Sequence, residues 1–371
     1  MASPANRIIA EFKRNPLMPA NPRSFLVYCR PGFEREAASE LVEQASMIGL
    51  DGEASAEEGQ GFVSWQGQGV NPRRMQELRF DQLIFARQLL QAYDCLTLPE
   101  QDRLSPLLAA IAEIPDKFSD VVFEGPDTND GKALSGFFKR FQPKLIESLQ
   151  AAKRLAEPSK AAPRLHLFWL DKQHCLPALS YLHNRSEWPM GIPRLKMPHE
   201  APSRSTLKLV EALHTLMSDN ELRERMRAGQ RAVDLGAAPG GWTWQLVNRG
   251  LKVIAVDNGP LKGSLVDDPL VQHLREDGLR YRPRKAVDWV VCDMVEKPSR
   301  IAQLIAGWLA DGAARQAIFN LKLPMKKRYD EVHRCFAIID DILDRAGLSY
   351  ILRAKQLYHD REEITCFLAK K

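Results

Sequence analysis

The sequence predicts an α/β protein whose second half, residues 205–371, forms a doubly wound and mostly parallel sheet. Three observations support this prediction. After residue 205, apolar runs of strand length alternate with amphipathic helical runs, which is typical of a parallel sheet covered by helices on both faces. A glycine-rich turn directly follows the first of these strands. In residues 24–190, strands and helices alternate irregularly, which indicates a separate α+β region.

Composition narrows the class of protein. The chain has 371 residues, of which 44% are hydrophobic and 27% charged, as in soluble globular proteins. No apolar run is long enough to span a bilayer, and the N-terminus lacks the apolar core of a secretory signal. Six scattered cysteines without a C-x-x-C pair argue against disulfides and structural zinc. We therefore expect a cytoplasmic protein, a monomer without metal or membrane, whose net charge of +5 permits a polyanionic partner.

The first region begins after residues 1–23, whose Pro, Asn and Arg content predicts a mobile extension. Residues 51–61 are acidic and contain glycine, so they are predicted to be a loop. Residues 131–155 have the pattern of a basic amphipathic helix. Strands are expected within 24–45 (before a Pro-Gly turn and a helix), 62–66, 83–90 and 121–130, and a hairpin within 164–184.

Two alternatives are open for the aromatic and basic residues of the amphipathic helix. Phe137 and Phe141 flank Lys139 and Arg140. The phenylalanines could belong to the core beneath exposed basic side chains, or they could stack on nucleobases. The sequence does not decide between these alternatives.

The second region begins after a proline-rich segment without periodicity, residues 191–204, which is predicted to be a linker. Residues 205–217 follow as a helix with Leu209, Leu213, Leu216 and Met217 on one face. Further helices are expected at 240–250, 301–310 and 330–347, and strands at 231–236, 252–257, 269–275, 287–294, 316–323 and 363–370.

A ligand site is predicted at the stretch VDLGAAPGGW, residues 233–242. Gly236, Gly240 and Gly241 allow the backbone to approach a ligand where a Cβ would clash. The helix that begins there favours an anionic group at its N-terminus. No Gly-Lys-Ser/Thr follows, so a nucleoside-triphosphate P-loop is not expected. Asp257 ends the next strand and suits a ribose diol, which leaves dinucleotide binding open.

Two more acids end strands of the same sheet. Asp277 follows the third strand, and it could equally be an ordinary helix N-cap. Asp293 ends the fourth strand, at the carboxyl edge where ligands bind in such sheets. Asp234 lies inside its strand and is interpreted as a brace for the glycine turn.

Lys322 is unusual because it ends the apolar strand IFNLKLP. Burying an ammonium is costly unless it is paired or gives up its proton. A lysine that reaches from the strand end to water is the simpler alternative. Lys326, Lys327 and Arg328 follow in a turn, either as a solvated loop or as contacts to phosphates.

The series PSRSTLKL, DLGAAPGGW, VDNG, CDM, NLKLP and HDREE resembles the FtsJ-like 2′-O-ribose methyltransferases, which carry a Lys-Asp-Lys-Glu tetrad. The resemblance implies a Rossmann-like domain that transfers a methyl group from S-adenosylmethionine to a cytidine ribose in 23S rRNA. It places the tetrad on Lys208, Asp293, Lys322 and Glu363, with Glu362 as the fallback for the glutamate. The implied contacts to S-adenosylmethionine fall on Ser205, Ala238, Pro239, Gly240, Gly241, Asp257, Asp277 and Asp293.

The chemistry of such a tetrad depends on the charge of Lys322. A lysine can accept the hydroxyl proton only when it is neutral. Desolvation and the like charge of Lys208 lower its pKa, while the carboxylates of Asp293 and Glu363 favour the ammonium. The sequence leaves this balance open.

The first region resembles the RNA-binding part of the same enzymes, which contains a THUMP domain, in CRPGFEREAASEL, LIFARQ and MGIPRLK.

Three other functions are weighed against ribose methylation. One is RNA base methylation with Cys292 as nucleophile, although no proline-cysteine motif is present. Another is a non-catalytic rRNA-binding assembly factor, for which a full tetrad is not expected. The weakest is a nicotinamide oxidoreductase, because G-x-G-x-x-G is absent.

Overall fold

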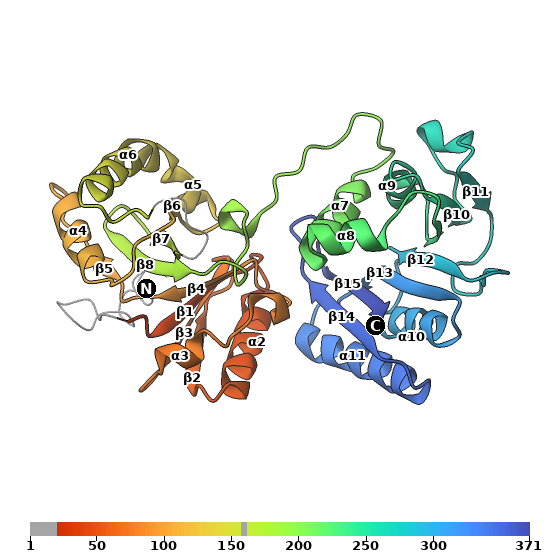
Figure 1. Ribbon diagram of the computed structural model, residues 1–371, viewed down its shortest axis with the longest axis horizontal. Coiled ribbons are helices and arrows are strands. Elements are labelled where there is room, and N and C mark those ends of the chain that lie inside the picture. Colours follow the sequence, from red (N-terminus) through yellow and green to blue (C-terminus); the bar gives the residue numbers. More distant parts are fainter. Residues whose placement is uncertain (1–20, 157–161) are drawn as a thin grey trace. The chain divides into compact units, whose positions relative to one another are not determined.

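Figure 1 shows the computed structural model, which describes residues 21–156 and 162–371. The predicted mobile extension therefore lies almost entirely outside the described residues. By its internal contacts the chain divides into two compact units, one ending at Ile192 and the other spanning Pro193–Lys371. Each unit has its own sheet and its own hydrophobic core. Among the described residues, no helix is both long and apolar enough to cross a membrane.

The first unit is an α+β domain, as predicted. Its sheet has the order β2-β3-β1-β4-β8-β7-β6, with β5 paired to β8. Among the named strands of the described residues, only β6 and β7 pair in parallel, and an isolated parallel bridge joins Phe118 and Leu155. The strands are β1 (Ser24–Tyr28), β2 (Gly52–Ala56), β3 (Phe62–Gly67), β4 (Gln88–Ala92), β5 (Leu96–Thr97), β6 (Asp120–Glu124), β7 (Arg164–Trp169) and β8 (His174–Ser180). The helices are α2 (Glu34–Met47), α3 (Pro72–Met75), α4 (Leu104–Ala112), α5 (Asn129–Ala133) and α6 (Ser135–Ala151), with 3-10 turns at Phe80–Gln82 and Pro189–Gly191.

Two predictions for this unit were wrong in part. Residues 51–61 are not all loop, because Gly52–Ala56 forms an edge strand against β3. A Cβ on Gly52 would lie 2.4 Å from the Trp65 ring, so the glycine permits the close pairing. The strand expected at 83–90 begins only at Gln88. Just before it, the backbone amides of Ile84 and Phe85 donate to the Glu40 carboxylate instead of to a neighbouring strand.

The phenylalanines of α6 belong to the core of the first unit. Phe137, Phe138 and Phe141 pack with Phe123 on β6 and Trp169 on β7, and the ring centroids of Phe137 and Trp169 are 4.9 Å apart. Lys139 and Arg140 are exposed on the outer face of the helix. The structure thus favours the first of the two alternatives, core aromatics beneath exposed basic side chains.

The second unit has the predicted doubly wound sheet, in the order β11-β10-β9-β12-β13-β15-β14. All its pairs are parallel except those that β15 makes with β13 and β14. The strands are β9 (Arg231–Leu235), β10 (Lys252–Val256), β11 (Val271–Leu274), β12 (Val287–Cys292), β13 (Ala314–Lys322), β14 (Tyr350–Lys355) and β15 (Glu363–Lys370). The helices are α7 (Ser205–Leu216), α8 (Asp219–Arg225), α9 (Gly241–Val247), α10 (Pro298–Ala310) and α11 (Arg328–Arg345), with a 3-10 turn at Gly263–Val266.

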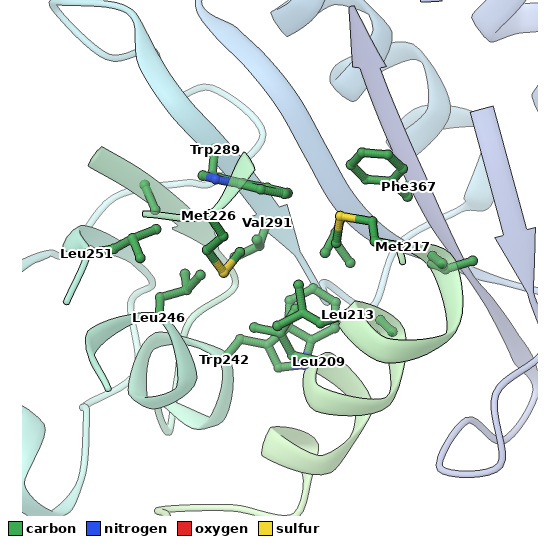
Figure 2. Close-up of a cluster of buried hydrophobic side chains, with 14 of the residues drawn as sticks. Leu209, Leu213, Met217, Met226, Trp242, Leu246, Leu251, Trp289, Val291 and Phe367 are labelled. Carbon is green, nitrogen blue, oxygen red and sulfur yellow. The ribbon is translucent and has the colours of Figure 1, made fainter. Parts of the chain in front are cut away.

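A buried cluster fixes α7 and α9 on one face of this sheet (Figure 2). The predicted apolar face of α7 is confirmed, because Leu209, Leu213, Leu216 and Met217 all lie in the cluster. It also contains Trp242 and Leu246 of α9 and Trp289, Val291 and Phe367 of the sheet. On the opposite face, α10 packs against β13 and α11 (Figure 1). This packing brings the first turns of α7 to the carboxyl ends of β9, β12 and β13.

Candidate active site

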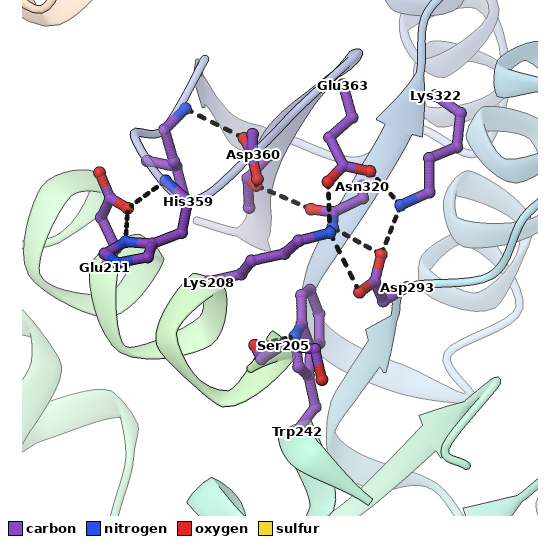
Figure 3. Close-up of polar contacts among 12 residues, drawn as sticks. Ser205, Lys208, Glu211, Trp242, Asp293, Asn320, Lys322, His359, Asp360 and Glu363 are labelled. Atoms are coloured by element: carbon purple, nitrogen blue, oxygen red, sulfur yellow. Dashed lines mark hydrogen bonds and ion pairs between the residues drawn. The ribbon is translucent and has the colours of Figure 1, made fainter. Parts of the chain in front are cut away.

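Four side chains from four separate parts of the chain meet at the carboxyl edge of the second sheet (Figure 3). Asp293 follows the last residue of β12, and Lys322 is the last residue of β13. The antiparallel register places Glu363, the first residue of β15, directly opposite Lys322. Lys208 reaches in from the first turns of α7. The residues of the expected tetrad are thus neighbours in the structure.

The two carboxylates bridge the two lysines. Lys322 Nζ donates to Asp293 Oδ1 at 2.6 Å and to Glu363. Lys208 Nζ donates to Glu363 and lies 3.5 Å from Asp293 Oδ2. Glu363 is only 5% exposed, whereas 23% of the Lys322 side chain is exposed. Lys322 is therefore the more accessible partner, and the buried Glu363 carboxylate fixes its position.

Glu362, the fallback for the glutamate, is directed elsewhere. Its Oε2 accepts a hydrogen bond from Arg328 at 2.6 Å, and more than half of its side chain is exposed. Consecutive residues of an extended chain face opposite sides, so only one of the two glutamates can meet the lysines. In this structure that residue is Glu363.

The pKa of Lys322 answers the question that the sequence left open. Burial disfavours the ammonium, but the charges of Asp293 and Glu363 and their hydrogen bonds outweigh burial. The net effect raises the pKa of Lys322 above its usual value. With the tetrad arranged as it is here, Lys322 is therefore an ammonium at neutral pH.

A chain of buried polar groups orients Asp293, and sequence reasoning missed it. Asn320 Nδ2 donates to Asp293 Oδ1 at 2.7 Å, and Asn320 Oδ1 accepts from the Thr365 hydroxyl at 2.7 Å. That hydroxyl lies 3.0 Å and 3.2 Å from the two oxygens of Asp360, a carboxyl whose pKa is raised well above its usual value by burial. Asn320 and Lys322 share a strand face, as do Glu363 and Thr365, so the two-residue period was the available signal.

The loop before β15 is tied to α7 by Glu211. This buried carboxylate accepts hydrogen bonds from the backbone amides of Tyr358 and His359. Its Oε2 also lies 2.6 Å from His359 Nδ1. His359 therefore anchors the loop that leads to Glu363.

A cavity of about 360 Å³ lies beside the tetrad and contains half of the expected cofactor residues. Ala238, Asp257, Asp277 and Asp293 line it. The other four form the turn behind it and the start of α7. They are Ser205, Pro239, Gly240 and Gly241. Asp293 thus belongs both to the cavity and to the tetrad.

The glycine turn at this cavity needs its glycines. Gly236 and Gly240 have φ angles of 77° and 113°, which other residues rarely adopt. A Cβ on Gly241 would lie 2.1 Å from Ser205 Oγ, so the glycine lets α9 approach α7. Asp257 fixes the turn from the neighbouring strand, since its Oδ2 accepts from Ala238 N at 3.0 Å and its Oδ1 from Gly259 N at 2.7 Å.

Negative charge is concentrated at this edge of the sheet. Asp234 is buried, and burial together with the charges of Asp293 and Asp257 raises its pKa to about 7. The Thr243 hydroxyl donates to Asp234 at 2.6 Å, so Asp234 braces the start of α9, directly after the glycine turn that it was expected to brace. Asp277 Oδ1 accepts from the backbone amide of Leu279 at 2.9 Å. An edge with this many carboxylates suits a ligand that carries positive charge.

Comparison with known families accounts for both units. Residues 23–90 match the RlmM ferredoxin-like domain, residues 102–181 the N-terminal domain of ribosomal RNA large subunit methyltransferase M, and residues 201–321 the FtsJ-like methyltransferase domain. The ribosomal RNA large subunit methyltransferase M of Laribacter hongkongensis is 49% identical over 93% of this chain and 96% of its own length. That of Methylococcus capsulatus is 48% identical over 94% and 98%. The chain belongs to the ribosomal RNA large subunit methyltransferase M family.

Membership of the ribosomal RNA large subunit methyltransferase M family makes this protein a methyltransferase that uses S-adenosylmethionine. The carboxylate-rich edge and the glycine turn suit that cofactor, which carries a sulfonium, an ammonium and a carboxylate. Among solved structures, TrmN from Thermus thermophilus aligns over 94% of this chain with 16% identity and a TM-score of 0.34.

Cys292 does not have the properties of a nucleophile in this methyltransferase. Its side chain is fully buried in β12, and burial raises the pKa of the thiol to about 12. A thiolate is the reactive form, so this cysteine is unreactive at neutral pH.

Within the described residues, no group of His, Cys, Asp and Glu side chains has the arrangement of a metal site.

Met294 shapes the cavity beside the tetrad, and no sequence pattern indicated this role. A Cβ on Gly236 would lie 2.5 Å from Met294 Cγ, and one on Gly278 would lie 2.9 Å from its sulfur. Two glycines from different connections therefore make room for one methionine side chain. Met294 and Val295 both line the cavity directly after Asp293.

Proposed function

We propose that this protein methylates the 2′-hydroxyl of a cytidine ribose in 23S rRNA, with Lys322 as the proton acceptor. The observation that supports this most directly is the position of Asp293. Its carboxylate binds Lys322 and also lines the cavity assigned to the methyl donor. A hydroxyl bound at Lys322 would therefore lie beside the cofactor site, as a direct transfer requires.

Eight residues would hold the cofactor. We assign its ribose diol to Asp257, its adenine end to Asp277 and its amino-acid end to the region of the glycine turn and Asp293. Ser205, Ala238, Pro239, Gly240 and Gly241 would complete the contacts. When bound, S-adenosylmethionine supplies the electrophilic methyl group.

The remaining chemistry concerns the proton of the ribose hydroxyl. We assign its removal to Lys322 in its neutral form, while Asp293 and Glu363 hold both lysines in place. In the arrangement described above the pKa of Lys322 is raised, so only a small fraction is neutral at pH 7. Covering the tetrad with RNA would strengthen the desolvation that opposes the ammonium, and Lys208 adds a like charge. The reaction should accordingly become faster as pH rises.

Exposed apolar side chains flank the tetrad and support a nucleoside substrate. Val295 follows Asp293 by two residues and is 93% exposed, and Met325 follows Lys322 by three residues and is 89% exposed. Large apolar side chains left in water next to a polar site are typical of a binding surface. We assign them to the base and sugar of the target nucleotide, and the exposed Lys326 and Lys327 to neighbouring phosphates.

The division of labour follows the two regions of the chain. We assign RNA binding to residues 24–190, including the expected THUMP domain, and methyl transfer to residues 205–371, with residues 191–204 as linker. We further propose that the protein acts as a monomer in the cytoplasm and without a metal.

Two alternatives have less support. Base methylation with Cys292 as nucleophile conflicts with the burial and the high pKa of that thiol. A non-catalytic assembly factor would not require four interacting tetrad residues beside a cofactor cavity. Both alternatives predict that the strain lacking this protein keeps all its 2′-O-methylated nucleotides.

The test is nucleoside mass spectrometry of 23S rRNA from a deletion strain and from strains complemented with variants. We expect one 2′-O-methylcytidine to disappear on deletion and to return with the wild type and with Cys292→Ser. Lys322→Ala should fail to restore it, because loss of a general base lowers the reaction rate roughly 10²–10⁴-fold. The purified variant should still bind S-adenosylmethionine. Full activity of Lys322→Ala would refute the assigned role, and loss of a base methyl group instead would refute ribose methylation.

A further inference from the structure

The connection between β11 and β12 leaves part of one face of the second sheet, over β10 and β11, without a covering helix. Parallel strands are usually joined by a helix that packs on the sheet, but residues 275–286 form a loop. The loop borders a cavity of about 650 Å³ whose floor includes Ile254 of β10 and Gln272 and Leu274 of β11. Val253, the neighbour of Ile254, lies in the core cluster beneath α7 and α9. Because successive strand residues face opposite sides, this cavity opens on the face of α10.

The wall of this cavity is strongly basic. It includes Arg231, Arg280, Arg282, Arg284 and Lys285, all of them exposed, and a single carboxylate, that of Glu276. Arg280 is partly balanced by Asp277, whose Oδ2 is 3.6 Å from its Nε. Within the part of the chain that the structure describes, no carboxylate forms an ion pair with Arg284 or Lys285. We call this group of five cations and the cavity they surround the basic cavity.

The loop of the basic cavity is fixed rather than loosely attached. The Arg231 guanidinium donates to the Ala286 carbonyl at 2.7 Å. The Arg282 guanidinium lies 5.5 Å from the centre of the Trp308 ring on α10, and the Tyr281 ring lies 6.4 Å from the same tryptophan. These contacts hold cations close together around one cavity despite their mutual repulsion. A solvated loop without a ligand has no need of such an arrangement.

We propose that the basic cavity binds phosphate groups of the rRNA backbone, at a distance from the nucleotide that is methylated. One arginine guanidinium can donate two parallel hydrogen bonds to the oxygens of one phosphate. An RNA backbone presents several phosphates in a row, so binding it requires several cations on one surface. Glu276 lines both the basic cavity and the cofactor cavity, so the two are adjacent on the same unit. This inference rests on the proposed function, because it assumes an RNA substrate, and it adds a contact surface on the catalytic unit itself.

The test uses the double variant Arg284→Gln/Lys285→Gln in the full-length protein. Neither side chain touches the cofactor cavity, so S-adenosylmethionine binding and the melting temperature should be unchanged. Binding to 23S rRNA from the deletion strain is measured by filter retention over a range of salt concentrations. We expect affinity to fall several-fold and the slope of log K against log salt to decrease by about 2, since each phosphate contact contributes ~0.9.

A matched control removes the same charge elsewhere on the unit. Arg334→Gln/Arg345→Gln on α11 replaces two exposed arginines, and it should leave the affinity and the salt slope close to the wild type. If the two double variants weaken RNA binding equally, the effect is one of net charge and the inference is overturned. It is also overturned if Arg284→Gln/Lys285→Gln loses binding of inorganic phosphate but keeps its RNA affinity, because the site then serves a free anion.

The outcome is separable from that of the proposed function. If wild-type protein methylates the rRNA and the Arg284→Gln/Lys285→Gln variant binds RNA as well as the wild type, the basic cavity is not an RNA site, although the enzyme assignment stands. If wild-type protein leaves the ribose unmethylated while the variant still lowers the salt slope, RNA binding at the basic cavity stands without the proposed reaction.

Discussion

Lys322 and Glu363 face each other across an antiparallel strand pair, as the last residue of β13 and the first of β15. A direct cross-strand position fixes the two side chains at one point of the sheet edge, and Glu363 is almost fully buried there. The same carboxylate also binds Lys208. Register therefore sets the charge environment of the lysine to which we assign the proton transfer.

The first prediction concerns the pH dependence of methyl transfer. The charges of Asp293 and Glu363 raise the pKa of Lys322, so the neutral base becomes more abundant, and the rate increases, as pH rises. Glu363→Gln removes one of these charges. It should move the rising limb of the pH–rate profile to lower pH by roughly one unit. Single-turnover rates at saturating S-adenosylmethionine between pH 6 and 10 cover the rising part of the profile, which lies below the raised pKa of Lys322, and measure its displacement.

Glu362→Gln is the matched control for this prediction. It removes the same charge from the adjacent residue, which binds Arg328 instead of the tetrad. Its limb should coincide with that of the wild type. If the limb of Glu363→Gln also stays in place, Lys322 is not the group that titrates.

The second prediction concerns the polar chain behind Asp293. Thr365→Val removes the hydroxyl that binds Asn320 Oδ1, so the amide that orients Asp293 loses its support. We expect kcat to fall roughly tenfold while KM for S-adenosylmethionine changes little, because positioning of the reacting groups is affected more than cofactor contacts. Thr365→Ser keeps the hydroxyl and should restore kcat. Equal activity of the valine and serine variants would show that the chain does not position Asp293.

The tetrad could be predicted from sequence because its members lie in short motifs whose order resembles that of a family. Physical reasoning alone identified a lysine at the end of one apolar strand and acids at the ends of three others. It could not bring Lys208 to Glu363, since 155 residues separate them along the chain. That contact depends on the packing of α7 and on the β13–β15 register.

The charge of Lys322 could not be predicted for a different reason. Desolvation and two carboxylates shift the pKa of Lys322 in opposite directions, and their balance depends on distances such as the 2.6 Å between Lys322 Nζ and Asp293 Oδ1.

The edge strand Gly52–Ala56 was missed because its residues have low β-propensity. Pairing with β3, a tertiary effect, overrides that preference.

The third prediction concerns the exposed apolar side chains beside the tetrad. Met325→Ala should raise KM for rRNA about three- to tenfold with a smaller change in kcat, because burial of a methionine against a nucleoside contributes roughly 1 kcal/mol or more. Val266→Ala is the control, since Val266 is an exposed apolar side chain of the same unit that lies in the 3-10 turn Gly263–Val266, outside the segments that carry the tetrad. Steady-state kinetics with varied rRNA distinguish the two variants. Identical KM values for both would remove Met325 from the substrate site.

The fourth prediction concerns stability and follows from the buried Asp234. Its pKa is raised to about 7 in the folded protein, whereas it ionises near its usual low pKa in the unfolded chain. The unfolded state therefore releases this proton first, and stability should decline as pH rises from about 4 to about 7. Asp234→Asn keeps an acceptor for the Thr243 hydroxyl but cannot ionise. It should raise the free energy of unfolding at pH 8 by about 1–3 kcal/mol relative to the wild type, with a much smaller gain at pH 4.

Urea unfolding at constant ionic strength, at pH 4 and pH 8, measures this difference. Asp311→Asn is the control, because Asp311 is exposed at the end of α10 and has the same chemistry without the burial. Asp311→Asn should have the same small effect on the free energy of unfolding at both pH values. If Asp234→Asn destabilises the protein equally at pH 4 and pH 8, the carboxyl is ionised in the folded state, and its neighbours Asp257 and Asp293 do not hold the proton on it.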